Sequence, residues 1–150
     1  KNNMANYYGS NMANDFPIFY NDLLYHSSEA LYQSLRFTES DHYQDIITYI
    51  NVNNSFLSKK RAYEFITETR SDWDDVKVDI MEKVLRIKTD QHKSRITDWL
   101  YQTGTRDIVE KSYKDGFWGA IPKGQYLEGY NVLGTLWMII REEIYLNKSI

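Results

Sequence analysis

One segment of this chain, residues 103–141, constrains the fold most, because it interrupts strongly apolar helical runs with glycine, aspartate, asparagine and tryptophan. Its two densest parts are residues 115–119 (DGFWG) and residues 129–134 (GYNVLG). Glycine lets the backbone adopt positive φ or approach a ligand closely, and tryptophan offers a flat apolar face with one donor. The composition favours a shaped pocket; a long surface loop built of turn residues is the alternative.

The rest of the chain is dominated by apolar residues at helical spacing. Serine and asparagine side chains stand at several expected helix starts, where they cap free backbone N–H groups. The pattern predicts helices over residues 29–37, 41–50, 55–67, 71–91 and 93–101, and a last helix that begins at Asn131.

Strand signals are few and short. The aromatic run 16–20, the turn signal Asn21-Asp22 and the run 23–25 predict a β-hairpin. Residues 106–110 alternate weakly as a short strand, and residues 120–129 are interpreted as loop. The sequence therefore predicts an α+β fold: a single compact, helix-rich domain over residues 1–150 with a few short β-strands.

The composition argues against several classes of site. The chain of 150 residues has no cysteine, which excludes disulfides, thiolate catalysis and cysteine metal ligands. Three scattered histidines show no metal-ligand spacing, so we expect no metal and no cofactor. A net charge of −3 gives no global attraction to nucleic acid or lipid. No run approaches the ~20 apolar residues of a membrane span and no leader pattern opens the chain, so we expect a cytoplasmic protein without membrane contact.

Several residues have both a structural and a functional interpretation. Glu29 lies in the first turn of a predicted helix, where the helix dipole alone favours a carboxylate. Trp73 lies in the first turn of another helix and suits either the core or the wall of a pocket. Asn131 can cap the last helix, or bind phosphate together with nearby N–H groups. The basic triplet 59–61 reads as a solvated face.

Four blocks, taken together and in order, resemble the NADAR, or YbiA-like, family. Asn6-Tyr7-Tyr8 resembles its S-N-[FY]-[FY] block, and residues 28–37 (SEALYQSLRF) resemble its T-x-E-H-x-[YF]-Q-A-x-K-F block. Residues 70–73 (RSDW), with Met81 and Lys88, resemble R-x-D-W…M…K. Residues 103–141 resemble T-G…[LV]-E…D-x-x-W-G…G-x-N-x-L-G…M-x-x-R. The resemblance covers nearly the whole chain.

Three positions depart from the family's pattern. Ala30 stands where the second block has histidine after its glutamate. Arg36 replaces the usual lysine and so presents a planar fork in place of a compact ammonium group. Ala120-Ile121 stands where a second glycine is expected after Trp118-Gly119. These departures bear on the substrate more than on the fold.

The resemblance implies a metal-independent N-glycosidase, a hydrolase that cleaves a ribosyl–nitrogen bond. The substrate classes it implies are phosphoribosylamino-pyrimidine intermediates of riboflavin synthesis and ADP-ribose attached to guanine. The expected partner is therefore a small ribosylated nucleotide or an ADP-ribosylated nucleic acid. Cleavage of such a bond builds positive charge at the anomeric carbon, which a nearby carboxylate stabilises.

The resemblance also implies roles for individual residues. Glu29 matches the family's glutamate and is the expected catalytic carboxylate, with Asp115 as a partner carboxylate or a ligand for a sugar hydroxyl. Trp73 and Trp118 are the expected stacking faces, and Arg36 is the expected contact for phosphate or ribose. The other expected substrate-binding residues are Asn6, Tyr7, Gly119 and Asn131.

Two other classes of protein remain as alternatives. A non-catalytic module that binds ADP-ribose or a similar nucleotide would keep the pocket without the chemistry, and Ala30 is the departure that favours it. Retention of Glu29 and Asp115 favours the enzyme; a purely structural or protein-interaction domain is the third possibility. A nucleic-acid substrate would need a basic rim, for which residues 59–61, or Lys111 and Lys114, are candidates.

Overall fold

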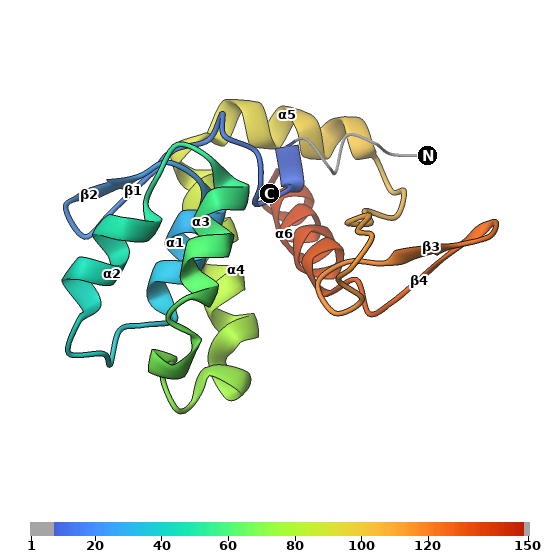
Figure 1. The fold of residues 1–150 in the computed structure, drawn as a ribbon. Helices are drawn as coiled ribbons and strands as arrows, with labels where there is room; N and C mark the ends of the chain where they lie inside the picture. The colour runs from blue at the N-terminus through green and yellow to red at the C-terminus, as the bar shows by residue number, and fades with distance from the viewer. Residues whose placement is uncertain (1–7, 149–150) are drawn as a thin grey trace. The chain divides into compact units, whose positions relative to one another are not determined.

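The computed structural model describes residues 8–148, which form six α-helices, one 3₁₀-helix and four short strands (Figure 1). These elements confirm the helix-rich α+β fold class. Within the described residues, no helix combines the length and the apolar character needed to cross a membrane. The chain forms two compact units: the α1 unit, Asn11–Gln91, and the α6 unit, the described parts of Lys1–Ser10 and His92–Ile150. Each unit is described by itself, and the single-domain expectation for residues 1–150 stays a prediction.

The α1 unit begins with the predicted hairpin (Figure 1). Strand β1 (Ile18–Tyr20) pairs antiparallel with β2 (Leu23–Tyr25). Asn21 and Asp22 connect them with φ of 50° and 62°, the positive values that a two-residue hairpin turn requires and that these two residue types tolerate. The remaining elements are α1 (Ser28–Leu35), α2 (Tyr43–Ile50), α3 (Ser55–Tyr63), the 3₁₀-helix η2 (Ile66–Glu68) and α4 (Trp73–Gln91).

Helix α1 is buried along its whole length, because α3 and α4 both pack against it. Half of its residues are nevertheless polar: Ser28, Glu29, Gln33 and Ser34, which are all buried. Buried polar groups cost free energy unless they have a hydrogen-bond partner. The polar face of this helix therefore needs a structural or functional reason.

The predicted helix over residues 55–67 is shorter than expected. Helix α3 ends at Tyr63, and a separate turn of 3₁₀-helix follows at Ile66–Glu68. Between them Phe65 leaves helical geometry, with φ −113° and ψ 21°, and packs against the buried cluster of Phe37, Ile46, Ile50 and Ala62. The break in the helix allows Phe65 to make this contact, which the helical spacing of the sequence did not indicate.

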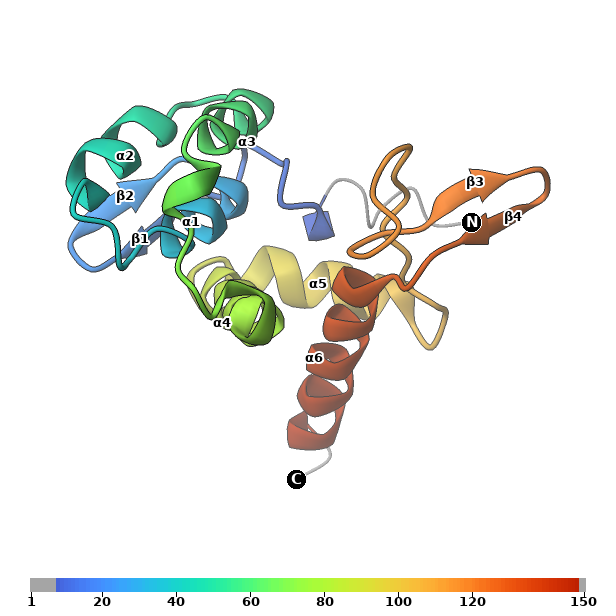
Figure 2. The ribbon, with the colours of Figure 1, turned by 60° about the horizontal axis from the view of Figure 1, so that its bottom comes forward.

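The α6 unit contains α5 (Lys93–Thr103), β3 (Ile121–Lys123), β4 (Tyr126–Glu128) and α6 (Val132–Lys148). Helices α5 and α6 lie against each other (Figure 2) through Trp99 and Trp137, whose rings meet edge to face with centroids 5.2 Å apart. The Nε1 of Trp137 donates to the Gly9 carbonyl at 2.9 Å. A Cβ on Gly9 would lie 2.7 Å from the Trp99 ring, so only glycine fits there.

Two expectations for this unit were wrong. Residues 120–129 form an antiparallel hairpin, β3–β4, and not a loop. The strands are three residues long and one contains Pro122, so they leave no readable alternation. Residues 106–110 form no strand. A single parallel bridge joins Lys111 to Ala120 instead.

Candidate functional site

Three polar side chains of the second family block share one face of α1. Glu29, Gln33 and Arg36 follow the i, i+4, i+7 spacing that aligns side chains along a helix. The helix starts here because the hydroxyl of Ser27 caps it, accepting from the Ala30 N–H at 3.1 Å. The sequence thus places a carboxylate, an amide and a guanidinium in a row, with the carboxylate in the first turn.

The carboxylate of Glu29 is buried, with 5% of the residue exposed. Its Oε1 accepts a hydrogen bond from Gln33 Nε2 at 3.0 Å, and its backbone N–H donates to the Asn11 carbonyl at 3.2 Å. Burial strengthens the electrostatic effect of this carboxylate on any charge that develops beside it. The position suits the predicted catalytic role, which stays a prediction.

Buried acceptor atoms without a partner gather around the start of α1. Among the described residues, Asn11 Oδ1, Ser28 Oγ and Gln33 Oε1 have no hydrogen-bond partner. Asn11 is fixed at its other amide atom, since Nδ2 donates to Met81 Sδ at 3.0 Å. Such atoms call for an explanation in a native protein, and a bound ligand is one of the few available. Hydroxyl groups, as on a ribose, are suitable donors to them.

The side chain of Arg36 is held at the end of the same face. Its guanidinium carbon lies 5.5 Å from the centroid of the Trp73 ring, and its Nε donates to Thr69 Oγ1 at 2.8 Å. Among the described residues its two Nη groups have no hydrogen-bond or ion-pair partner. Stacking on an aromatic face orients a guanidinium while leaving its edge available for an anion.

Trp73 itself is part of the wall behind Arg36. The residue is 6% exposed, and its ring tilts against that of Tyr32 with centroids 5.1 Å apart. The core and pocket interpretations of Trp73 are therefore compatible. The buried ring packs on Tyr32, and it also carries the guanidinium of Arg36. Its role as a stacking face for a base stays a prediction.

An ion pair braces the start of α4 beside this wall. Arg70 donates to both carboxylate oxygens of Asp72, at 2.6 and 2.9 Å, and to Thr38 Oγ1 at 3.1 Å. The hydrogen bond from Arg70 lowers the pKa of Asp72 below its ordinary value. This pair holds the loop that leads into Trp73, whose N–H donates to the Arg70 carbonyl at 3.2 Å.

The α6 unit holds the other predicted site residues, and there Asp115 builds a turn. Its Oδ1 accepts from the N–H groups of Phe117 and Trp118, both at 2.9 Å, which is the geometry of an Asx turn. Trp118 is half-buried and meets Phe117 edge to face, with centroids 4.9 Å apart. Gly119 is required sterically, because a Cβ there would collide with the Glu110 carbonyl oxygen. Roles in catalysis or binding for these residues stay predictions.

Asn131 connects α6 to the segment before the turn. Its Oδ1 accepts from the Glu110 N–H and its Nδ2 donates to the Ile108 carbonyl, each at 2.9 Å. The residue has a φ of 51°, a left-handed value that asparagine tolerates. Its side chain thus bonds backbone groups of residues 108 and 110 rather than capping the helix.

The N–H groups at the start of α6 are also occupied by the protein itself. Those of Asn131, Val132 and Leu133 donate to the carbonyls of residues 117–119 at 3.0–3.1 Å. The backbone route to phosphate binding expected at this helix start is therefore filled. A substrate contact through the Asn131 side chain stays a prediction. Asn6 and Tyr7 lie outside the described residues.

Sequence reasoning did not single out Gln33, Asn11 or Tyr32 as site residues. Gln33 could have been found, since it stands four residues after Glu29 within the quoted block. Tyr32 also stands in that block, but its contact with Trp73 joins residues far apart in the chain. Asn11 carries no local signal, because its contact with Met81 is likewise distant in sequence.

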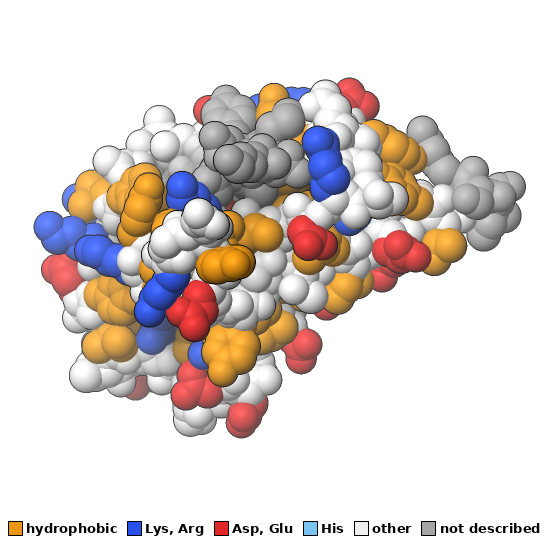
Figure 3. All heavy atoms as spheres, turned by 90° about the vertical axis from the view of Figure 1, so that its right-hand side faces the viewer, with side chains coloured by type: hydrophobic (Ala, Val, Ile, Leu, Met, Phe, Trp, Pro, Cys, Tyr) orange, Lys and Arg blue, Asp and Glu red, His pale blue; other side chains and the backbone are white. Residues whose placement is uncertain are grey.

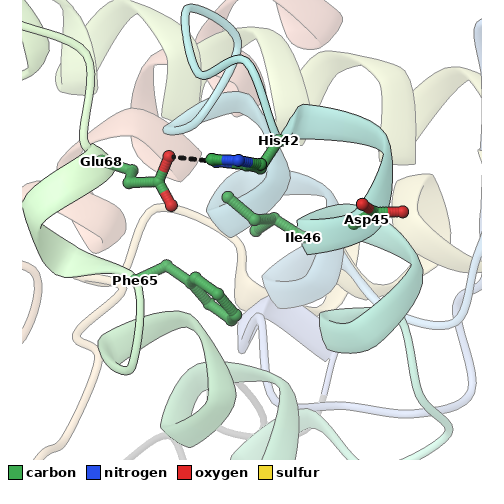
Figure 4. A pocket seen from close by; sticks show the side chains of 5 residues that line it. All are labelled: His42, Asp45, Ile46, Phe65 and Glu68. Atoms are coloured by element: carbon green, nitrogen blue, oxygen red, sulfur yellow. Dashed lines mark hydrogen bonds and ion pairs between the residues drawn. The ribbon is translucent and has the colours of Figure 1, made fainter.

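A hollow of about 380 Å³ lies elsewhere on the α1 unit (Figure 4). It is lined by His42, Asp45, Ile46, Phe65 and Glu68, none of which was predicted to act in the site. Glu68 Oε1 accepts from Ser40 Oγ at 2.6 Å and lies 3.1 Å from His42 Nδ1. This hydrogen bond raises the pKa of the exposed His42. Among the described residues, no group of three or more acidic and histidine side chains could hold a metal ion.

In both candidate basic rims, a basic side chain already contacts a neighbouring tyrosine. In the triplet 59–61, Arg61 already lies 4.4 Å from the Tyr49 ring centroid and donates to the Tyr49 carbonyl at 2.8 Å. Lys111 lies 5.8 Å from the Tyr113 ring centroid. On the face drawn in Figure 3, basic, acidic and apolar side chains are interspersed.

Comparison with known proteins identifies relatives that match most of the chain. A family model described as "NADAR domain" matches residues 1–145. The protein named N-glycosidase YbiA from Escherichia coli (strain K12) is 27% identical over 133 residues, which cover 89% of this chain and 79% of that protein.

Two longer relatives carry riboflavin biosynthesis names. Riboflavin biosynthesis protein VVA0006 from Vibrio vulnificus (strain YJ016) is 30% identical over 79% of this chain and 30% of its own length. Riboflavin biosynthesis protein PYRR, chloroplastic, from Zea mays is 32% identical over 77% of this chain and 19% of its own length. This chain therefore spans less than a third of either protein.

A solved structure confirms the expected fold. The NMR structure of the Escherichia coli protein YbiA matches with a TM-score of 0.77 and 28% identity, covering 94% of this chain and 79% of that one.

Proposed function

This chain belongs to the NADAR family, and we propose that it is an N-glycosidase that hydrolyses a ribosyl–nitrogen bond. The observation that carries the proposal is the buried carboxylate of Glu29, held by the Gln33 amide on the face of α1 that also bears Arg36. The likeness to proteins named N-glycosidase YbiA supports the reaction class.

Glu29 acts on the charge that develops during bond cleavage. As the bond between the anomeric carbon and the nitrogen lengthens, positive charge builds on the sugar ring. The Glu29 carboxylate stabilises this charge and orients a water molecule for attack. The water oxygen bonds to the anomeric carbon, the electron pair of the broken bond stays with the nitrogen, and a proton from the water passes through the carboxylate to the leaving base.

Arg36 binds the anionic part of the substrate. Its stacking on Trp73 and its hydrogen bond to Thr69 fix the plane of the guanidinium. A planar fork matches the paired oxygens of a phosphate or pyrophosphate better than an ammonium group does. The change from the family's lysine to arginine therefore tunes this contact rather than removing it.

The remaining predicted residues have proposed roles of their own. Asp115 serves as a partner carboxylate or a ligand for a sugar hydroxyl through the carboxylate oxygen that does not build the turn. Trp73 and Trp118 supply aromatic faces for the base. The other proposed substrate contacts are Asn6, Tyr7, Gly119 and Asn131.

For the substrate, we favour ADP-ribose joined to a guanine base, free or in nucleic acid, because the Arg36 fork suits a pyrophosphate. A phosphoribosylamino-pyrimidine is the second class, and the names of the two riboflavin biosynthesis relatives support it. Neither class requires a metal in this scheme.

A non-catalytic binder of ADP-ribose-like nucleotides is the alternative function. The observation that favours it is Ala30, which is fully buried and brings no imidazole to the position where the family's block has histidine. A protein that had lost a proton-transfer group could keep the pocket and bind the nucleotide without hydrolysis.

Mass spectrometry of reaction products separates these possibilities. The protein is incubated with a short DNA carrying ADP-ribosyl-guanine and, separately, with a phosphoribosylamino-pyrimidine. The expected result is release of ADP-ribose from the DNA by wild type and not by Glu29→Gln. Glu142→Gln, which changes an exposed carboxylate on α6, is the matched control and should retain turnover.

The other outcomes are equally informative. Release of ribose 5-phosphate from the pyrimidine substrate would assign the second substrate class. Wild-type protein that binds ADP-ribose tightly and hydrolyses neither substrate would replace the enzyme with the non-catalytic binder.

A further inference from the structure

We propose that Gln33 positions the Glu29 carboxylate through one atom of its amide and takes a hydroxyl group of the substrate with the other. The inference rests on the proposed N-glycosidase function and assigns to that site a residue that the motif comparison left without a role. It also assigns a ligand chemistry, a hydroxyl donor such as a ribose hydroxyl or the attacking water.

The first half of the inference comes from the donor atom. Gln33 Nε2 lies 3.0 Å from Glu29 Oε1, a normal hydrogen-bond distance. Both residues are at least 95% buried and stand on the same helix. Two side chains fixed to one rigid helix and bonded to each other have little rotational freedom, so the bond sets the direction of the carboxylate.

An amide is well suited to that task. It donates a hydrogen bond without carrying a net charge, so it orients the carboxylate without itself neutralising it. The Arg70–Asp72 pair shows the other case, in which a guanidinium binds both carboxylate oxygens at 2.6 and 2.9 Å. A carboxylate that must stabilise a developing positive charge keeps more of its effect beside an amide than beside a cation.

The second half of the inference comes from the acceptor atom. Gln33 Oε1 is buried and has no hydrogen-bond partner among the described residues. Leaving such an atom without a partner destabilises a folded protein. The bond from Nε2 to Glu29 accounts for the donor half of the amide. A hydroxyl donor that arrives with the ligand accounts for the acceptor half, Oε1.

Neighbouring acceptors point to the same ligand chemistry. Asn11 Oδ1 and Ser28 Oγ are also buried without a partner, and both residues adjoin Glu29, Asn11 through its carbonyl and Ser28 in sequence. A site rich in acceptors around a carboxylate fits a ligand rich in hydroxyl groups. A ribose has this character, whereas a phosphate dianion has no donor to offer.

The test is steady-state turnover of Gln33→Met, on whichever of the two candidate substrates the wild type hydrolyses. Methionine keeps the volume and the helix propensity but cannot donate or accept as the amide does. We expect kcat/KM to fall about 10- to 100-fold, the range for loss of a hydrogen bond to a charged group. Gln33→Glu removes the donor and adds a second carboxylate beside Glu29. Its kcat/KM should be at least as low as that of Gln33→Met.

Ser34→Ala is the matched control. Ser34 is buried on the same helix, but its Oγ donates to the Ala30 carbonyl at 2.7 Å and does not bond Glu29. It should lose some stability and retain kcat/KM. If Gln33→Met retained kcat/KM while Glu29→Gln lost it, the Gln33 inference would be overturned and the proposed function would stand.

A double-mutant cycle tests the bond between Gln33 and Glu29 without any measurement of turnover. The unfolding equilibrium constants of wild type, Glu29→Met, Gln33→Met and the double variant are measured in urea. Coupling of more than about threefold is expected if the two side chains bond as described. Absence of turnover in the wild type would overturn the proposed function and, with it, the substrate contact of Gln33. Additivity in the cycle would overturn the positioning role of Gln33 and leave the proposed function standing.

Discussion

The α1 face and the turn of the α6 unit use the same kinds of side chain in opposite ways. On α1, the carboxylate of Glu29 bonds to the side chain of Gln33, while Gln33 Oε1 is left without a partner among the described residues. In the turn, the carboxylate of Asp115 and the amide of Asn131 bond to backbone groups. The α1 face leaves a polar atom available for a ligand, whereas the polar side chains of the other region bond the backbone of their own unit.

The difference follows from secondary structure. A helix bonds most of its backbone groups to one another. At the start of α1 the Ser27 hydroxyl and the Asn11 carbonyl accept from two further N–H groups, so the side chains of α1 are not needed for this task. Residues 106–120 form no regular element beyond one isolated bridge, so side chains must supply the missing backbone partners. A polar residue in a family block is thus more informative about chemistry when it stands on a capped helix than when it stands in an irregular segment.

The largest expected effect is the loss of turnover in Glu29→Gln. The change keeps the shape and removes the charge, so turnover should fall by about 10²–10⁴-fold, while the midpoint of thermal unfolding changes little. Product release by mass spectrometry and a melting curve on the same protein preparation check both parts. If Glu29→Gln lowered the midpoint of thermal unfolding strongly as well as turnover, Glu29 would be a structural residue. The two regions would then not differ in this respect.

Asn131→Ala should have the largest effect on stability. It leaves the Glu110 N–H and the Ile108 carbonyl without their partner and puts alanine at a φ of 51°. The free energy of unfolding should fall by about 2–4 kcal/mol, measured by urea denaturation. Asn131→Asp keeps the acceptor for Glu110 and should lose less. A fully stable Asn131→Ala protein would show that the turn does not depend on this side chain.

Asp115 distinguishes the two uses of a carboxylate within one residue. Asp115→Ala removes the acceptor for two N–H groups and should cost about 1–2 kcal/mol of stability. Asp115→Asn keeps that acceptor and should fold as well as wild type, yet lose about tenfold in kcat if the charge acts on the substrate. Unchanged kcat in the folded Asp115→Asn variant would remove Asp115 from the proposed site.

The smallest effect is expected at the exposed pair of His42 and Glu68 beside the hollow of the α1 unit. The hydrogen bond from Glu68 raises the pKa of His42 above its ordinary value of 6.5, so protonated His42 stabilises the folded state. This stabilisation is fully present below pH 6.5 and is lost as the pH rises through the raised pKa. Unfolding of His42→Ala in urea should differ from wild type on the acidic side and converge with it on the alkaline side. A difference that is the same at all pH values would assign the effect to packing.

Much of the architecture could be predicted because its causes are local. The helices follow apolar spacing, and the β1–β2 turn follows from Asn21 and Asp22, whose positive φ values the sequence pair favours. The family blocks placed Glu29 and Arg36, and helical spacing alone aligns them along one face of α1. The hydrogen bond between Gln33 and Glu29 could also have been predicted, since Gln33 stands one turn after Glu29.

What only the tertiary structure decided rests on contacts between residues far apart in the chain. Residues 106–110 form no strand, and the Glu110 N–H donates instead to the side chain of Asn131, 21 residues further along the chain. An alternation of residues cannot predict such a contact. Helix α3 ends at Tyr63, and Phe65 packs against a cluster to which α2 and Phe37 contribute as well as Ala62 of α3. Whether a buried polar atom has a partner is likewise settled by what surrounds it. Spacing along the chain determined which side chains lie together on a helix, and packing determined which of them were left unsatisfied.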